Sequence, residues 1–222
     1  RDFQMSATPR SWSWNSSDLV LEELPWGQLA PYNCALAIEA VRAVTPVTKT
    51  AVLAALSAAT LPGRCERWLL GSVPVIVDVA HNPAGAVFLQ ELLAYRYPDA
   101  RFAVILGMLA DKDASGVPLA FAGNEVPCWI ATASRGPRGR SAASLAQQLG
   151  VENLGVAETP AGALDAALEQ VRSGVADAVL GFGSFSLVED LRNELLLRGA
   201  VAQPDAEPDP RDHDQAPAER RT

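Results

Sequence analysis

The sequence predicts an α/β protein with a mostly parallel, Rossmann-like sheet that carries helices on both faces, preceded by the tail end of a second α/β domain. After Arg64, short apolar runs alternate with segments of helical spacing, which is typical of parallel sheets built from βαβ units. Residues 1–60 lack this alternation. We therefore divide the chain into residues 1–60, residues 61–199 and a tail of residues 200–222.

In the first region, residues 1–30 contain short apolar runs separated by turn-forming residues, which predicts two or three short antiparallel strands. Because so few strands cannot form a core by themselves, we expect them to be the last strands of a sheet whose other strands lie upstream of Arg1. Helical spacing begins at Pro31, with Asn33 in the first turn, and a second helix is predicted at about residues 47–59. Because the first residue is not methionine, we expect the chain to begin inside a longer polypeptide.

The second region opens at Leu61-Pro62-Gly63-Arg64, a break that marks a domain hinge or a tight turn. A guanidinium on such a turn is either simply exposed or directed into a cleft between domains, where it binds phosphate or stacks on an adenine. Strands are predicted at residues 66–70, 74–79, 102–106, 129–132, near 156 and at 176–180; helices are predicted at 83–97, 142–149, 161–171 and around 187–195.

Residues 200–222 combine several prolines with charged and polar residues, so we predict that this tail is disordered. His213 lies in it and needs no role. This leaves His81 as the one histidine of the predicted ordered region.

The formal net charge of −8 argues against nucleic-acid binding, which requires a clustered basic face. A short basic run, Arg135, Arg138 and Arg140, forms either a solvated loop or an anion clamp. No apolar run has the length of a membrane span and no signal peptide is evident, so we expect a cytoplasmic protein without a membrane partner.

Three widely spaced cysteines, Cys34, Cys65 and Cys128, form neither a disulfide framework nor a metal-binding pattern. We expect reduced thiols in or near the core. The sequence also lacks the G-x-x-x-x-G-K-[ST] phosphate loop. Gly181-Phe182-Gly183 begins a dinucleotide fingerprint, but Ser186 replaces its third glycine, so NAD binding by a dehydrogenase-like domain is only weakly supported.

The most informative stretch is V-I-V-D-V-A-H-N-P at residues 75–83, in which a buried strand delivers Asp78, His81 and Asn82 to the start of a helix. These residues either form only a turn and a helix cap or they bind a ligand. Three other strand ends carry polar or glycine-rich loops, at residues 111–113, 134–140 and 181–184. In a parallel sheet these ends share one edge, so all four loops could face one crevice.

Five motifs in order resemble the bacterial bifunctional dihydrofolate synthase/folylpolyglutamate synthases, relatives of the Mur ligases. They are L-P-G-R at 61–64, D-V-A-H-N-P at 78–83, G-M-L-A-D-K-D at 107–113, R-G-P-R-G at 135–139 and G-S-F at 183–185. The resemblance runs from about Leu24 to Arg198. It implies that residues 1–60 end the ATP-binding central domain and that residues 61–199 form the glutamate-ligase domain.

The resemblance also implies the chemistry. Such enzymes are ADP-forming ligases that phosphorylate a carboxylate of dihydropteroate or a folate with ATP and Mg²⁺, after which the L-glutamate amine displaces the phosphate. It implies that Asn33, Arg64 and Asp78 bind ATP, and that His81 and Ser184 lie at the meeting of the nucleotide and glutamate sites. Lys112 and Arg138 are implied as weaker candidates for binding a substrate carboxylate.

Some family features are missing from the sequence. The phosphate loop, the magnesium ligands and the modified lysine of the family belong upstream, so we expect no ligation by the chain alone and a monomer when complete. The family's glutamine before the residue aligned with Asn33 is replaced here by Ala30 and Pro31. A different class of protein stays open: a stand-alone, non-catalytic α/β module that binds a nucleotide or an amino acid.

Overall fold

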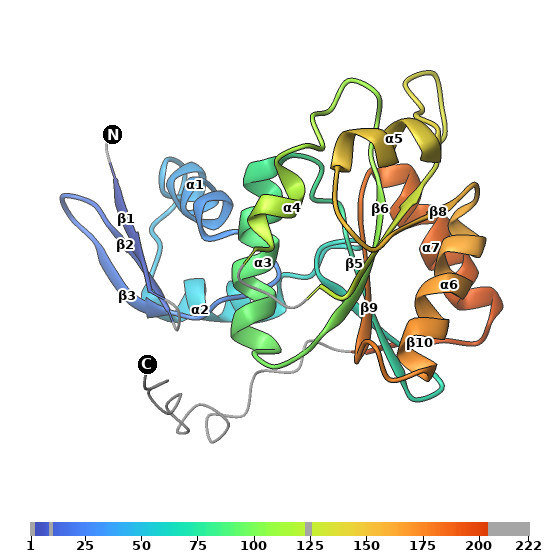
Figure 1. Ribbon diagram of the computed structural model, residues 1–222. Helices are drawn as coiled ribbons and strands as arrows, with labels where there is room; N and C mark the ends of the chain where they lie inside the picture. Colours follow the sequence, from blue (N-terminus) through green and yellow to red (C-terminus); the bar gives the residue numbers. More distant parts are fainter. Residues whose placement is uncertain (1–2, 9–10, 123–125, 204–222) are drawn as a thin grey trace, which may run out of the picture.

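The computed structural model describes residues 3–8, 11–122 and 126–203 (Figure 1). The predicted disorder of residues 204–222 lies outside this range. The strands are β1 (Gln4–Ala7), β2 (Trp12–Asn15), β3 (Val20–Leu24), β4 (Glu66–Leu70), β5 (Val73–Asp78), β6 (Phe102–Gly107), β7 (Cys128–Thr132), β8 (Leu154–Ala157), β9 (Ala178–Gly183) and β10 (Val201–Gln203). The helices are α1 (Pro31–Arg42), α2 (Lys49–Ala58), α3 (Pro83–Arg96), α4 (Val117–Ala120), α5 (Ala142–Leu149), α6 (Pro160–Arg172) and α7 (Phe185–Leu197).

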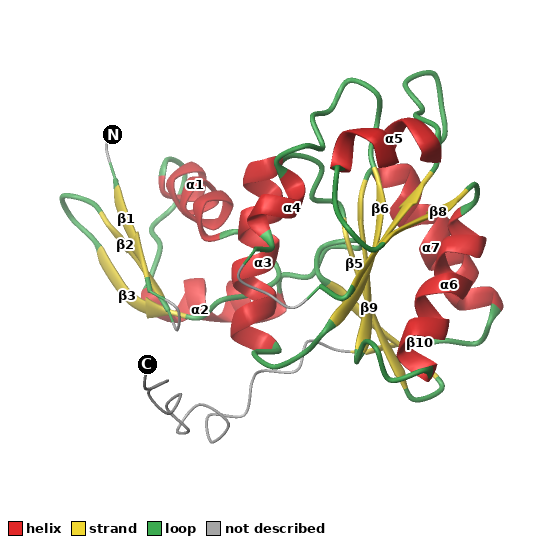
Figure 2. Ribbon diagram, viewed as in Figure 1, coloured by secondary structure: helices red, strands yellow, loops and turns green. Residues whose placement is uncertain are grey.

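The larger sheet has the strand order β10-β4-β5-β9-β6-β7-β8. Strands β5, β9, β6, β7 and β8 pair in parallel, whereas β4 pairs antiparallel with both β5 and β10. Figure 2 shows helices on both sides of this sheet. The predicted mostly parallel, doubly covered α/β sheet is therefore confirmed.

Neighbouring residues of the central strands face opposite sides of the sheet, which explains why their sequences are apolar throughout. In β5, Ile76 packs in the core beneath α3, α4 and α5, while Val75 and Val77 pack in the core beneath α6 and α7. In β6, Val104 and Ile105 divide in the same way. A strand that is apolar at every position satisfies both faces at once.

The smaller sheet contains β1, β2 and β3, paired antiparallel as predicted. It packs with α1 and α2 around a separate core that includes the fully buried Trp12 and Trp14. Figure 1 shows this unit beside the larger sheet, with α3 between them. The boundary of the two units at residues 60 and 61 stays a proposal.

The structure differs from the prediction at the end of the larger sheet. Residues 201–203 form β10, which pairs with β4 through the partners Val201 and Leu69, so the prediction that disorder begins at residue 200 was wrong. A left-handed turn at Gly199, with φ of 77°, leads the chain back to this edge. A strand of three residues has too little sequence pattern to be predicted.

The described residues bear on two further expectations. Among the described residues, Cys34, Cys65 and Cys128 form no disulfide; the first two are buried and the third is partly buried. Among the helices of the described part, none is both long enough and apolar enough to span a bilayer.

Candidate functional site

The carboxyl ends of β5, β9, β6 and β7 lie at one edge of the sheet because these strands are parallel. The chain leaves β5 into α3 on one face, whereas it leaves β9, the neighbour of β5, into α7 on the other face. Ligands bind at such points of open α/β sheets, because the two connections diverge and leave a crevice. The predicted loops at residues 78–82, 111–113, 134–140 and 181–184 therefore share this edge.

Asp78, the last residue of β5, is buried and makes two hydrogen bonds to the backbone. Its Oδ1 accepts from the Ala80 N–H at 2.6 Å, and its Oδ2 accepts from the Cys65 N–H at 2.7 Å. Burial raises the pKa of the Asp78 carboxyl above its ordinary value of 3.8, against the opposing effects of these two donors and of the charges on Arg64 and His81. Asp78 thus joins the end of β5 to the turn that precedes β4.

That turn, residues 61–65, has an unusual backbone. Gly63 and Cys65 have φ values of 72° and 43°, in the left-handed region that costs little only for glycine. A Cβ at position 63 would also lie 2.9 Å from a methyl carbon of Val188. Arg64 stands between these two residues and is half-buried.

Asn82 confirms the capping interpretation of the strand end in part. Its side chain accepts from the Gly85 N–H at 2.7 Å and caps α3, and Pro83 occupies the first turn of that helix. His81 does something different: its Nδ1 lies 3.0 Å from the Val79 carbonyl oxygen. Because a carbonyl only accepts, this contact assigns the proton to Nδ1 and leaves Nε2 for another partner.

A cleft of about 540 Å³ lies beside this strand end, between the two sheets. It brings together four of the predicted site residues, Asn33 from α1, Arg64 from the turn, Asp78 from β5 and His81 from the loop after it. The first turn of α3 also lines it, so that the positive end of a helix dipole faces the space. These residues come from both units of the chain.

One wall of the cleft was not predicted. Trp26 and Phe88 line it and stack on each other, with ring centroids 6.0 Å apart and planes 14° from parallel. Buried Gln28 lines it too and accepts from the Leu61 N–H at 3.3 Å, which ties the loop before α1 to the turn. The helical spacing of Ala84, Gly85, Phe88 and Glu91, which line the same cleft, is the signal that could have revealed this face of α3.

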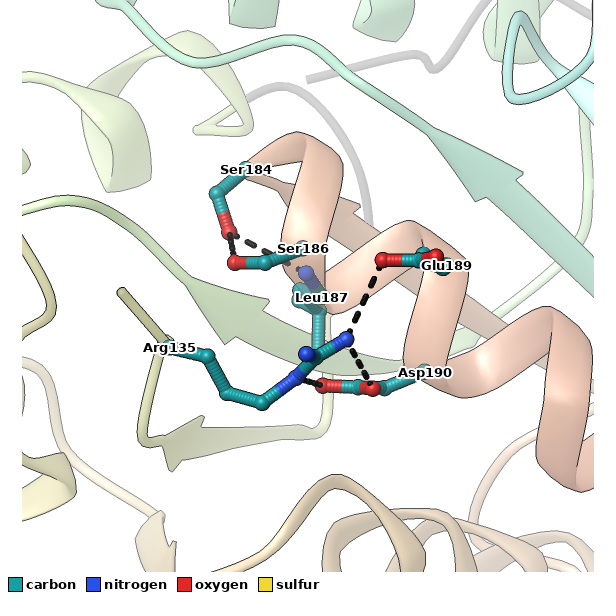
Figure 3. A network of polar contacts seen from close by, with 6 residues as sticks. All are labelled: Arg135, Ser184, Ser186, Leu187, Glu189 and Asp190. Atoms are coloured by element: carbon teal, nitrogen blue, oxygen red, sulfur yellow. Dashed lines mark hydrogen bonds and ion pairs between the residues drawn. The ribbon is translucent and has the colours of Figure 1, made fainter.

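Ser184 does not line this cleft. It is the N-cap of α7: its Oγ accepts from the Leu187 N–H at 3.2 Å and lies 3.1 Å from the Ser186 Oγ (Figure 3). In the register of β5 and β9, Phe182 pairs with Asp78, so Ser184 follows two residues later on the same sheet edge. Ser184 and His81 therefore follow the ends of two neighbouring strands, but Ser184 does not line the cleft that His81 lines.

Lys112 and Arg138 come together outside the cleft, on either side of Asp111. The Lys112 Nζ lies 3.8 Å and an Arg138 guanidinium nitrogen 3.1 Å from the Asp111 carboxylate. Arg140 donates to the carbonyl oxygens of Ala110 and Lys112, which joins the loops after β6 and β7 into one unit. A substrate carboxylate at this place would replace Asp111 as their partner.

The basic run contains no unpaired guanidinium in the described structure. Arg135 binds the Asp190 carboxylate at 2.6 Å and Glu189 at 3.1 Å (Figure 3). Arg138 and Arg140 are engaged as described above. Arg135 and Arg138 are nevertheless exposed, as in the alternative of a solvated loop, and an anion clamp would have to displace their protein partners.

Comparison with known proteins gives a consistent result. Residues 63–185 match the family described as "Mur ligase, glutamate ligase domain". The chain is similar to dihydrofolate synthase/folylpolyglutamate synthase of Escherichia coli, with 34% identity over 189 residues that cover 84% of this chain and 43% of the relative. The protein of the same name from Mycobacterium tuberculosis is 33% identical over 187 residues, 79% of this chain and 37% of that protein. The chain spans less than half the length of these curated relatives.

Solved structures agree. Escherichia coli FolC in complex with DHPP and ADP has a TM-score of 0.70 and 33% identity, covering 88% of this chain and 46% of that one. A Yersinia pestis folylpolyglutamate synthase/dihydrofolate synthase with AMPPNP and Mn has a TM-score of 0.68 and 29% identity, covering 87% and 46%. A bifunctional synthase of the same name with Mn, AMPPNP and L-glutamate bound has a TM-score of 0.65 and 26% identity, covering 88% and 46%.

Proposed function

Because this chain belongs to the Mur ligase family, whose glutamate ligase domain its residues 63–185 match, we propose that it corresponds to the carboxyl-terminal part of an ATP-dependent, ADP-forming ligase. The enzyme would join L-glutamate to dihydropteroate, to tetrahydrofolate or to both. The similar proteins named above carry that function in their names, and their structures hold ADP or AMPPNP, DHPP and L-glutamate.

The observation that carries this proposal is the cleft lined by Asn33, Arg64, Asp78 and His81. The Arg64 side chain makes no hydrogen bond or ion pair with other described residues, so its guanidinium is available to a phosphate. The N-terminus of α3 adds further N–H groups on the same side. The stacked pair of Trp26 and Phe88 offers an aromatic wall for a nucleobase.

Within this proposal, Asp78 accepts from the ribose or adenine side of ATP. Each carboxylate oxygen has two lone pairs, so both remain able to accept after binding Cys65 and Ala80. Asn33 contacts the nucleotide from α1, and the His81 Nε2 and the Ser184 hydroxyl lie toward the glutamate. Lys112 and Arg138 would exchange Asp111 for a substrate carboxylate.

The reaction that we propose passes through an acyl phosphate. A carboxylate is a poor electrophile, so the γ-phosphate of ATP is first transferred to the carboxylate of the pterin or folate substrate. The glutamate amine then attacks the acyl carbon, and inorganic phosphate leaves. The contribution of this chain is to position the nucleotide and the amino acid and to balance negative charge.

Magnesium is not assigned to any residue here. Among the described residues, no three His, Cys, Asp or Glu side chains gather into a group that could hold a metal ion. A Mg²⁺ ion for the proposed enzyme would therefore need ligands beyond those described, including the phosphates.

The test is ADP release in the presence of glutamate and either dihydropteroate or tetrahydrofolate. It compares the chain alone with a fusion of the chain behind the amino-terminal half of the Escherichia coli relative. We expect glutamate-dependent ADP release from the fusion and none from the chain alone. Release by the fusion that does not exceed that of the amino-terminal half alone would contradict the proposal, and ATP binding without release would favour a non-catalytic module.

A further inference from the structure

Glu66, the first residue of β4, is joined to two parts of the molecule that carry proposed site residues. One carboxylate oxygen accepts from the Gly63 N–H at 2.8 Å. The same carboxylate lies 3.0 Å from the Nε of Arg192 on α7. The Glu66 side chain is only 16% exposed, so this pair is better shielded from water than an ordinary surface ion pair.

The contact with Gly63 completes the fixation of the turn at residues 61–65. The Gly63 carbonyl accepts from the Val79 N–H at 2.9 Å, and the Cys65 N–H donates to Asp78. The Glu66 carboxylate accepts from the single backbone donor of Gly63, its N–H. The contacts of Gly63 and Cys65 thus hold the backbone on both sides of Arg64, which lines the cleft.

Arg192 contacts the same carboxylate oxygen of Glu66 that accepts from Gly63. Its guanidinium carbon lies 6.0 Å from the ring centroid of Trp68, so the arginine is held between this ring and the carboxylate. Arg192 is on the helix that Ser184 caps. The pair therefore connects the turn that carries Arg64 with the helix that begins at Ser184.

We propose that Glu66 is a positioning residue: it holds the Gly63 N–H, with Arg192 as its support, and thereby fixes the turn that directs Arg64 into the nucleotide cleft. The expected effect of Glu66 on ATP binding rests on the proposed function. The expected effect of Glu66 on the turn does not depend on that function. Glu66 itself does not line the cleft, so it acts only through the turn.

The test uses the whole chain with the substitutions Glu66→Ala, Glu66→Gln and Arg64→Ala and with their double variant Glu66→Ala/Arg64→Ala. Glutamine keeps an oxygen acceptor for Gly63 but loses the charge that pairs with Arg192. The matched control is Asp165→Ala, which removes the carboxylate partner of Arg198 at the far end of α7. Two quantities are measured, amide hydrogen exchange at residues 64 and 65 and the dissociation constant for ATP.

We expect Glu66→Ala to accelerate exchange at residues 64 and 65 and to weaken ATP binding by about three- to tenfold, the scale of one lost hydrogen bond. Glu66→Gln should give a smaller effect, and Asp165→Ala should change neither quantity. The double variant should bind ATP no more weakly than Arg64→Ala alone, because the two residues act through the same contact.

Additive losses in the double variant, or an ATP affinity of Glu66→Ala equal to that of wild type, would overturn the proposal. If Glu66→Ala does not fold, Glu66→Gln decides by the same criteria. If the wild-type chain binds no ATP, the proposed nucleotide site is wrong, and the role of Glu66 is then tested by amide hydrogen exchange alone. Unchanged exchange rates at residues 64 and 65 in Glu66→Ala would overturn that role, and accelerated rates would support it.

Discussion

Asp78 accepts two backbone hydrogen bonds, which makes it a structural residue as well as a proposed ligand of ATP. Without this carboxylate, the buried N–H groups of Cys65 and Ala80 lose their acceptor. We expect Asp78→Ala to lower the free energy of unfolding by at least about 2 kcal/mol, since each buried donor left unsatisfied costs about 1–3 kcal/mol. Urea denaturation of both proteins at neutral pH measures this difference.

The control for this prediction is Asp113→Ala. Asp113 accepts from the Ser115 N–H at 2.9 Å but is exposed, so water can replace it and the loss should stay within about 0.5 kcal/mol. Equal losses in Asp78→Ala and Asp113→Ala would contradict this account.

The pKa of Asp78 is raised in the folded chain. The stability of the wild-type chain relative to Asp78→Asn should therefore be greatest below pH 3.8 and should fall as the pH rises through the raised value.

At the scale of elements, the ends of β6 and β9 meet so closely that they admit no side chain. Gly183 has a φ of 135°, and a Cβ there would lie 2.9 Å from the carbonyl carbon of Gly107. The Gly107 carbonyl also accepts from the Ser184 N–H at 2.8 Å. Glycine at position 183 is therefore what allows α7 to begin beside the end of β6.

We predict that Gly183→Ala destabilises the chain by about 1–3 kcal/mol more than Gly174→Ala, because a forced contact with backbone adds to the cost of the positive φ. Gly174 is the matched control: its φ is 75°, but no atom lies within 4 Å of a Cβ added there. Thermal and urea unfolding of the two variants measure the difference. Equal destabilisation of Gly183→Ala and Gly174→Ala would contradict this prediction, because the contact with the Gly107 backbone would then add nothing to the free energy lost.

The centre of the larger sheet was predictable because its central strands are buried on both faces and therefore largely apolar, as in Val75, Ile76 and Val77. The loops at the strand ends followed from parallel pairing. The strand at residues 201–203 was not predictable, since it depends on the free edge of β4 rather than on its own pattern. The contact of Trp26 with Phe88 joins two distant segments, and only the packed structure brings them together.

At the scale of the whole molecule, the cleft joins the two units of the chain. Asn33, Trp26 and Gln28 come from the first unit, whereas Arg64, Asp78 and His81 come from the second. The motifs at residues 61–64 and 78–83 indicated the second half of this site, and the structure adds the aromatic wall. Sequence could not separate Ser184 from His81, because both follow strands that end at the same edge.

The central claim is that this cleft binds a nucleotide. It is tested most directly by titrating the ¹⁵N-labelled chain with ATP and following the amide signals and the Trp26 indole signal by NMR. The account predicts saturable shifts at the turn of residues 63–65, at residues 80–85 and at Trp26, which Arg64→Ala weakens. No saturable shift, or shifts confined to residues away from this cleft, would contradict it.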